Sequence, residues 1–172
     1  MSAGRLWRVA LVVLSDKASA GERKDECISA MRAVLSSEFE IVSERVLPDE
    51  QALIERTLSA LCDGDDIDCV LTSGGTGLGP RDVTPQATLR IADYVVPGIG
   101  EAMRAASIAR VPTAMLSRAV AVVRGTTLVV NLPGSPSGAR ETLTTIAGVL
   151  PHALALLCGA AGEHTHDQVH RA

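Results

Sequence analysis

A glycine-rich segment carries the residue types and spacing best suited to chemistry in this chain. It runs from Leu71 to Thr88 as LTSGGTGLGPRDVTPQAT and begins at the end of a short apolar run, 68–71. Thr84 and Pro85 predict a helix start, because threonine caps helix N-termini and proline fits the first helical turn. A strand, a glycine loop and a helix N-terminus offer backbone N–H groups and a positive dipole end. The segment therefore predicts an anion-binding site.

The named phosphate-binding motifs do not fit this segment. A nucleoside-triphosphate P-loop needs lysine directly after its last glycine, whereas Pro80 follows Gly79 here. The dinucleotide fingerprint needs the spacing G-x-G-x-x-G, whereas Gly75, Gly77 and Gly79 give G-x-G-x-G. We therefore expect an anion site that a different loop builds.

Asp82 is the residue that an anion site alone does not explain. A carboxylate about 4 Å from a bound phosphate costs roughly 4 kcal/mol at an effective dielectric constant of about 20. A cation between the two groups removes that cost, and Mg²⁺ commonly binds one or two carboxylates together with substrate phosphates. The spacing alone fits equally well a solvated aspartate before a helix, paired with Arg81.

Polar residues also follow two other predicted strands. Asp49 comes after a short strand, where it could cap the next helix or stand on the same rim as Asp82. Ser15, Asp16 and Ser19 follow a buried strand, at the end where α/β sheets bind ligands. A polar turn that closes the strand explains these three residues equally well.

Apolar periodicity places these loops in an α/β architecture. The more polar run at 40–47 predicts a strand near a sheet edge, and the continuous apolar runs at 8–14 and 68–71 predict buried strands. The runs at 119–123 and 127–132 flank a tight turn, which predicts a hairpin and hence a mixed sheet. Predicted helices lie at 25–35, 52–61, 84–94, 100–109 and 139–157, the last interrupted at Pro151.

Composition limits the class of protein. The chain has 172 residues, of which 47% are apolar and 2% aromatic, which predicts one α/β domain at 1–160 with an aliphatic core. The polar end, 161–172, contains His164, His166 and His170, and we expect a flexible tail there rather than a metal cluster. A formal charge of −4 without a basic stripe argues against nucleic acid as a partner.

Hydropathy and cysteine usage predict the compartment. No apolar run is long enough to span a bilayer, which argues against a membrane partner. Four cysteines without a C-x-x-C pair indicate free thiols and a reducing, cytoplasmic location. An acidic chain that binds anions needs local cations, for which the candidates are Lys17, Arg81, Arg104, Arg118 and Arg124.

A second loop rich in glycine, proline and serine, 131–138, follows the last predicted strand. With the two loops placed, the sequence resembles the molybdenum-cofactor biosynthesis family, and within it the stand-alone molybdopterin adenylyltransferases related to the G domain of gephyrin. The resemblance covers nearly the whole chain, and it implies a three-layer α/β/α fold with a mixed, mostly parallel sheet, assembled as a homotrimer. The strongest matches are LTSGGTG at 71–77, RDVTP at 81–85 and NLPGSP at 131–136, with weaker ones at 15–16, 48–50, 97–104 and 116–118.

The activity that the resemblance implies is transfer of AMP from Mg·ATP to the terminal phosphate of molybdopterin, with release of pyrophosphate. The family's two key carboxylates correspond to Asp49 and Asp82, which we expect to be catalytic and to hold Mg²⁺. Expected nucleotide and phosphate contacts come from Thr72, Ser73, Gly74, Gly75, Thr76, Gly77, Asn131, Pro133, Gly134 and Ser135. Weaker candidates for molybdopterin are Ser15, Asp16, Ser19, Arg104 and Ser117.

A non-catalytic module of the same fold is the alternative function. Such a module would hold molybdopterin or deliver it to a partner, such as a molybdate-insertion enzyme, without consuming ATP. The sequence departs from the family at Cys27, where glycine is frequent, two residues after Asp25. That departure leaves the shape of the loop at 15–25 open.

Overall fold

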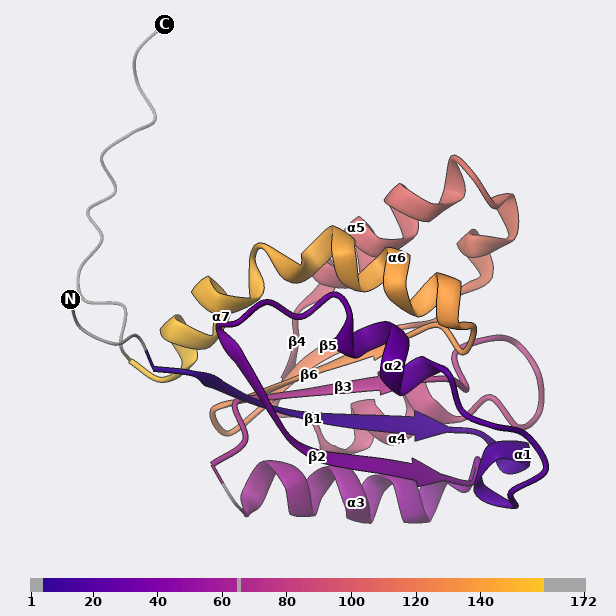
Figure 1. The fold of residues 1–172 in the computed structure, drawn as a ribbon, viewed down its shortest axis with the longest axis horizontal. Coiled ribbons are helices and arrows are strands. Elements are labelled where there is room, and N and C mark those ends of the chain that lie inside the picture. The colour runs from indigo at the N-terminus through magenta and orange to yellow at the C-terminus, as the bar shows by residue number, and fades with distance from the viewer. Residues whose placement is uncertain (1–4, 65, 160–172) are drawn as a thin grey trace, which may run out of the picture.

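A six-stranded sheet forms the centre of the computed structural model, which describes residues 5–64 and 66–159 (Figure 1). The strands are β1 (Trp7–Leu14), β2 (Phe39–Leu47), β3 (Cys69–Ser73), β4 (Tyr94–Val95), β5 (Ala121–Arg124) and β6 (Thr127–Leu132). Their order is β2-β1-β3-β6-β5-β4, with the first four parallel, β5 antiparallel to β6 and β4 antiparallel to β5. The expected mixed, mostly parallel sheet is confirmed, with β2 at its edge.

Helices cover both faces of the sheet. They are α1 (Asp16–Ser19), α2 (Cys27–Arg32), α3 (Gln51–Asp63), α4 (Thr84–Ile91), α5 (Pro97–Ile108), the 3-10 helix η1 (Pro112–Leu116), α6 (Pro136–Ala147) and α7 (Leu150–Leu157). Figure 1 shows α3 and α4 on one face and α2, α5, α6 and α7 on the other. The three-layer α/β/α arrangement is confirmed.

The side chains of β1 alternate between two hydrophobic cores. Val9 and Leu11 pack with the buried side of α2, α5, α6 and α7, whereas Ala10 and Val12 pack with α3 and α4. These four residues are 0% exposed, because a central strand between two helical layers has no solvent face. A double-sided core of this kind requires the continuous apolar run that the sequence shows.

The structure corrects three predicted boundaries. The helix expected at 25–35 is confined to α2, and the one expected at 84–94 ends at Ile91. Strand β4 follows and pairs with β5, and Pro97 begins α5 instead of ending a helix. Two residues are too few to show the alternation of a strand, so no periodicity indicates β4. The predicted interruption at Pro151 is confirmed, since this proline lies in the first turn of α7.

The four parallel strands end at one level. Leu14 of β1 pairs with Leu47 of β2, and Ser73 of β3 pairs with Leu132 of β6. The loops that follow these strands therefore leave the sheet side by side. This is the edge at which open α/β sheets bind ligands.

At the other ends of the parallel strands, the buried carboxylate of Asp68 contacts residues near both ends of the described chain. Its Oδ1 accepts a hydrogen bond from Arg5 Nη2 at 2.5 Å and lies 3.6 Å from Cys158 Sγ. Its Oδ2 accepts from the backbone N–H of Arg8 at 2.9 Å. Asp68 is 4% exposed, so these contacts satisfy a carboxylate that water barely reaches.

Several expectations concern the chain as a whole. The four cysteines are free thiols, as expected. Within the two described ranges, no helix is both long and apolar enough to cross a bilayer. The tail at 161–172, with His164, His166 and His170, lies outside the described residues. A single domain over 1–160 stays a prediction.

Candidate active site

The loops that follow β3 and β6 touch each other. Ser73 Oγ donates a hydrogen bond to the Pro133 carbonyl at 2.8 Å, and the N–H of Gly74 donates to the Leu132 carbonyl at 3.1 Å. A Cβ atom on Gly134 would lie 3.1 Å from the Cα of Gly74. Any side chain at position 134 would therefore push the two loops apart, and glycine permits their close approach.

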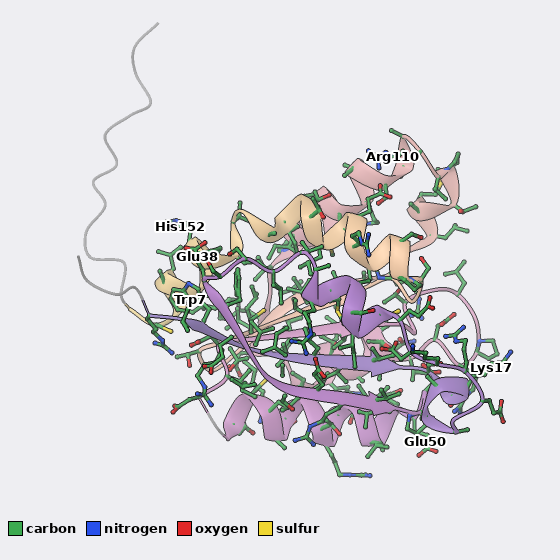
Figure 2. All side chains as sticks on the ribbon, viewed as in Figure 1. Trp7, Lys17, Glu38, Glu50, Arg110 and His152 are labelled. Carbon is green, nitrogen blue, oxygen red and sulfur yellow. The ribbon has the colours of Figure 1, made fainter. Side chains whose placement is uncertain are left out.

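Two aspartates join the loops that follow β1 and β2. The N–H of Asp16 donates to Asp49 Oδ2 at 3.0 Å, and the N–H of Asp49 donates to Asp16 Oδ1 at 2.9 Å. Arg81 donates to both carboxylate oxygens of Asp16, at 2.8 and 2.9 Å, and this hydrogen bonding lowers the pKa of Asp16. Figure 2 labels the next residues along, Lys17 and Glu50, at the edge to which β1 and β2 point.

Asp49 is not the helix cap that its position allowed. The N-cap of α3 is Glu50, and no side chain caps that helix. Asp49 Oδ1 is buried and has no hydrogen-bond partner within residues 5–64 and 66–159. Burial raises the pKa of Asp49, and the hydrogen bond from the N–H of Asp16 partly offsets this effect. Its carboxylate is thus half satisfied by the fold, and one oxygen is left for a ligand.

Asp82 is held by its own loop. Its Oδ2 accepts from the N–H of Gly79 at 2.8 Å, and a Cβ atom on Gly77 or Gly79 would lie 2.8 Å from the same oxygen. The suggested ion pair with Arg81 is wrong, because that guanidinium binds the loop after β1 instead. The charge of Asp82 contributes to the raised pKa of Asp49, so the two carboxylates share one electrostatic environment.

Gly75 lies between two buried oxygens. Its φ is +64°, and a Cβ atom there would lie 2.3 Å from Thr84 Oγ1 and 3.1 Å from Asp49 Oδ1. Neither oxygen has a hydrogen-bond partner in the part of the chain that the structure describes. The predicted capping role of Thr84 is wrong, since the N-cap of α4 is Val83.

The carboxylate oxygens of Asp49 and Asp82 fit a cation that is shared with a phosphate-bearing ligand. In the described ranges, no three His, Cys, Asp or Glu side chains are grouped so that they could hold a metal. Mg²⁺ needs no such cage, because it keeps several waters and takes one or two carboxylates together with substrate phosphates. Asp49 and Asp82 are the carboxylates that such a site would use, and the unpartnered Oδ1 of Asp49 has the chemistry of a magnesium ligand.

The backbone donors of the glycine loop begin one residue later than expected. The N–H of Gly74 already donates to β6, so it is not available to a phosphate, and that of Gly79 donates to Asp82. Among the described residues, no acceptor is found for the N–H groups of Gly75, Thr76, Gly77 and Leu78. These four consecutive N–H groups, which we call the cradle, are left as donors for an anion.

Three predicted contact residues face the protein interior. Thr72, Ser73 and Asn131 are each 0% exposed. Asn131 Nδ2 donates to Thr72 Oγ1 at 3.0 Å and to Thr88 Oγ1 at 2.9 Å, which ties β6 to β3 and α4. The structure therefore places these side chains beneath the two loops, where they fix the loop backbones.

A cavity of about 330 Å³ lies beside the glycine loop. Met103, Val111 and Leu116 form part of its apolar wall. The predicted site residues that line it are Thr76, Gly77, Arg104, Ser117, Pro133 and Ser135.

The residues predicted for molybdopterin are divided between two places. Arg104 and Ser117 line the cavity, whereas Ser15, Asp16 and Ser19 do not. Ser15 Oγ accepts from the N–H of Ala18 and caps α1, and Ser19 Oγ donates to the Asp16 carbonyl. The turn at 15–19 therefore has a structural role beside Asp49 and Asp82, which we call the acidic rim.

The predicted cations also separate. Arg124 is bound to Asp63 at the opposite edge of the sheet, so its candidacy for the anion site is wrong. Arg118 donates to the Gly77 carbonyl at 2.7 Å and to the Asp82 carbonyl at 2.5 Å. The sequence indicated Arg118 only as a cation near a loop; the weak family match at 116–118 was the available signal for more.

Fold and site together define a three-layer α/β/α domain with a glycine cradle and an acidic rim at the carboxyl ends of its parallel strands. Residues 10–152 match the family described as a probable molybdopterin-binding domain of molybdenum-cofactor biosynthesis. The chain belongs to this family.

Named relatives agree with this membership. The molybdopterin adenylyltransferase of Escherichia coli K12 is 49% identical over 140 residues, which span 79% of this chain and 71% of that protein. The molybdopterin adenylyltransferase of Helicobacter pylori J99 is 39% identical over 159 residues, 88% of each chain. A crystal structure of the molybdopterin biosynthesis enzyme MoaB from Thermus thermophilus superposes with a TM-score of 0.85 at 48% identity, covering 90% of this chain and 98% of that one.

Proposed function

We propose that the protein is a molybdopterin adenylyltransferase, which transfers AMP from ATP to the terminal phosphate of molybdopterin and releases pyrophosphate. The observation that carries the proposal is the buried Oδ1 of Asp49, which no other described residue satisfies and which lies beside the glycine cradle. Buried carboxylate oxygens are normally paired, so an unpaired one at a strand end favours a ligand-binding role. The names of the relatives support the same activity.

The reaction needs positioning more than covalent chemistry. An oxygen of the molybdopterin phosphate attacks the α-phosphorus of ATP, a new P–O bond forms, and the bond to pyrophosphate breaks in line. The N–H groups of Gly75, Thr76 and Gly77 donate to phosphate oxygens and stabilise the charge of the transition state. Orientation and these donors suffice for nucleotidyl transfer, so no covalent enzyme intermediate is required.

Asp49 and Asp82 would hold Mg²⁺ at the acidic rim, directly or through water. When it is bound, Mg²⁺ neutralises charge on the triphosphate. Asp16 accepts a hydrogen bond from the backbone of Asp49, which holds the Asp49 carboxylate in one orientation. Asp16 also neutralises the charge of Arg81, so the rim stays negatively charged. A rim of this charge would repel ATP without the metal, which makes nucleotide binding dependent on Mg²⁺.

The two substrates would share the surface between the rim and the cavity. We assign the loop from Pro133 to Ser135, including Gly134, to the nucleotide side, with the buried Asn131 beneath it. Arg104 and Ser117 are assigned to molybdopterin, because they line the cavity from α5 and from the segment after η1, outside the two loops. An arginine and a hydroxyl group suit a ligand that carries both a phosphate and a polar ring system.

Pyrophosphate release from ATP, measured with and without molybdopterin, tests the activity directly. We expect release that requires both molybdopterin and Mg²⁺. Asp82→Asn keeps the size of the side chain, should leave the unfolding transition in place and should lower the rate at least about 100-fold. If the wild-type protein binds molybdopterin but releases no pyrophosphate, the protein is a carrier module of the same fold instead.

We also propose that the protein acts as a homotrimer in the cytoplasm and passes its product to a molybdate-insertion enzyme. Exposed apolar side chains on α5 and beyond support assembly, since Ile108, Val111 and Met115 are 37%, 51% and 60% exposed. Light scattering on the purified protein would measure the mass of the assembly. A monomer at micromolar concentration would contradict the trimer.

A further inference from the structure

One arginine outside both loops holds three carbonyl groups of the glycine loop. The N–H of Arg118 donates to the Thr76 carbonyl at 2.9 Å, and its guanidinium donates to the Gly77 carbonyl at 2.7 Å and to the Asp82 carbonyl at 2.5 Å. Arg118 lies between η1 and β5, far from the loop in sequence, and its side chain is half-buried. The planar, fork-shaped guanidinium can bind two carbonyls in fixed directions, which a lysine ammonium cannot do.

These hydrogen bonds decide where the loop's N–H groups point. In a trans peptide, the C=O of one residue and the N–H of the next point in opposite directions, and the described chain contains no cis peptide bond. Because the Thr76 and Gly77 carbonyls face Arg118, the N–H groups of Gly77 and Leu78 face away from it. Both are among the cradle donors that lack an acceptor in the described ranges.

Arg118 acts at the acidic rim through the third carbonyl. Its bond to the Asp82 carbonyl fixes the backbone of this residue, while the N–H of Gly79 fixes the Asp82 carboxylate at 2.8 Å. The loop segment between them thus closes around Asp82. The guanidinium therefore sets the direction of the Leu78 N–H and the position of Asp82, a predicted magnesium ligand, while the backbone N–H of Arg118 sets the direction of the Gly77 N–H.

The segment that carries Arg118 is itself fixed. Arg104 Nη1 donates to the carbonyls of the two residues that flank Arg118, which are Ser117 at 3.4 Å and Ala119 at 2.9 Å. Gly100 leaves room for this contact, since a Cβ atom there would lie 3.2 Å from Arg104 Nη2. The cavity wall on α5 is thereby connected to the glycine loop through Arg118.

We propose that Arg118 is a positioning residue of the nucleotide site, which orients the N–H groups of Gly77 and Leu78 and the Asp82 carboxylate toward Mg·ATP. This inference rests on the proposed function for the identity of the nucleotide. It predicts that the residue affects nucleotide and metal binding even before any transfer occurs.

Binding of the α,β-methylene analogue of ATP, which cannot release pyrophosphate, tests the proposal. Calorimetric titration with Mg²⁺ present should give at least tenfold weaker affinity for Arg118→Gln and an intermediate loss for Arg118→Lys, which keeps the positive charge but not the planar fork that reaches two carbonyls. Half-saturation by Mg²⁺ should move to higher concentration in both variants. Turnover should fall more than affinity, because misplaced donors also fail in the transition state.

Arg124→Gln is the matched control. Arg124 also donates to a backbone carbonyl, that of Ile91 at 2.9 Å, but lies at the opposite edge of the sheet. It should lower the melting temperature without changing analogue affinity by more than twofold. A folded Arg118→Lys protein with wild-type analogue and Mg²⁺ affinities would overturn the proposal, and so would one that no longer folds, since Arg118 would then serve the fold.

Pyrophosphate assays of the wild-type protein keep this failure distinct from that of the proposed function. If the wild type binds Mg·analogue but releases no pyrophosphate, the activity is wrong while the role of Arg118 in binding is still decided by the titration. If the wild type does not bind Mg·analogue at all, both are overturned.

Discussion

Asp16 and Asp49 hold each other in place through a reciprocal pair of hydrogen bonds, each backbone N–H donating to the other's carboxylate at 3.0 and 2.9 Å. The pair joins the loops that follow β1 and β2, and it leaves Asp49 Oδ1 as the unsatisfied oxygen. An acidic pair would ordinarily separate by repulsion. Here the backbone donors and the guanidinium of Arg81 keep the two carboxylates together.

Two variants at position 16 separate position from charge. Asp16→Asn keeps an oxygen that can accept from the N–H of Asp49, so we expect adenylylation within about threefold of wild type. Asp16→Ala removes the acceptor, and we expect at least a tenfold loss because Asp49 is no longer fixed. Steady-state rates at several Mg²⁺ concentrations would measure both. Equal activity of the two variants would show that the pair does not position Asp49.

Asp49→Asn should separate stability from activity. Burial raises the pKa of Asp49 in the folded state, so its ionisation opposes folding. The stabilising contribution of the protonated carboxyl is fully present below the unfolded-state pKa and is lost as pH rises through the folded-state pKa. Without metal, the difference in melting temperature between Asp49→Asn and the wild type should therefore be more positive at pH 7 than at pH 4.

The same variant should lose its response to the metal. Mg·analogue should raise the melting temperature of the wild type and leave that of Asp49→Asn nearly unchanged, because the ligand oxygen has lost its charge. Thermal unfolding followed at pH 4, 5.5 and 7 would measure both effects. A variant that is less stable than wild type at every pH would contradict the assigned burial of an ionised group.

Gly75→Ala should disrupt the site at its centre. The new methyl group would meet Thr84 Oγ1 at 2.3 Å, on a residue whose φ is +64°. We expect a loss of stability of about 2 kcal/mol or more and little remaining activity. Gly98→Ala is the control, since nothing lies within 4 Å of its added Cβ atom. Urea unfolding of both variants would measure the difference, and equal midpoints would contradict the crowding at Gly75.

Asn131→Ala should destabilise the fold more than it disturbs nucleotide contacts. It would leave the hydroxyl groups of Thr72 and Thr88 without their buried donor and open a small cavity. We expect a loss of about 2–3 kcal/mol. Gln51→Ala removes an amide near the surface, bound to Glu55, and should change stability by less than about 0.5 kcal/mol. A stable Asn131→Ala protein that fails to bind nucleotide would return Asn131 to the contact set.

Cys27 supports the second loop, and its replacement should be felt there. Its side chain is 4% exposed, and Sγ lies 3.4 Å from the Gly134 carbonyl. Cys27→Ala should lower the free energy of unfolding by about 1 kcal/mol, and Cys27→Gly should lower it by roughly 1 kcal/mol more, because glycine weakens the start of α2. Denaturant unfolding would measure both, with Cys62→Ala as a control away from the loops. A glycine variant more stable than wild type would show that the cysteine strains this position.

The sequence predicted those parts of the site that depend on local pattern. A strand end and a glycine loop each have a short-range signature, which made Asp49 and Asp82 candidates, and the resemblance to the family then favoured a ligand role over a structural one. The mixed sheet followed from the apolar runs and the hairpin at Gly125. Patterns of this kind involve only a few neighbouring residues, so they can be recognised in the sequence without knowledge of the fold.

Contacts between distant segments could not be predicted in this way. Arg118 donates to carbonyls 36 and 41 residues earlier in the chain, and backbone carbonyls leave no trace in residue type. Asn131 looked like a ligand contact because it begins a glycine-rich loop, yet its amide is spent on Thr72 and Thr88. Tertiary hydrogen bonds decided both cases.

The contacts of Asp68 bear on how the polypeptide could be rewired. Arg5 and Cys158 meet at this one carboxylate, at the sheet edge remote from the acidic rim. A short peptide could therefore join residues near the two ends, and new termini could be opened in the surface turn at Gly125. Such a circular permutant should fold with the loops of Asp49 and Asp82 unchanged, since the closure lies at the other ends of the strands.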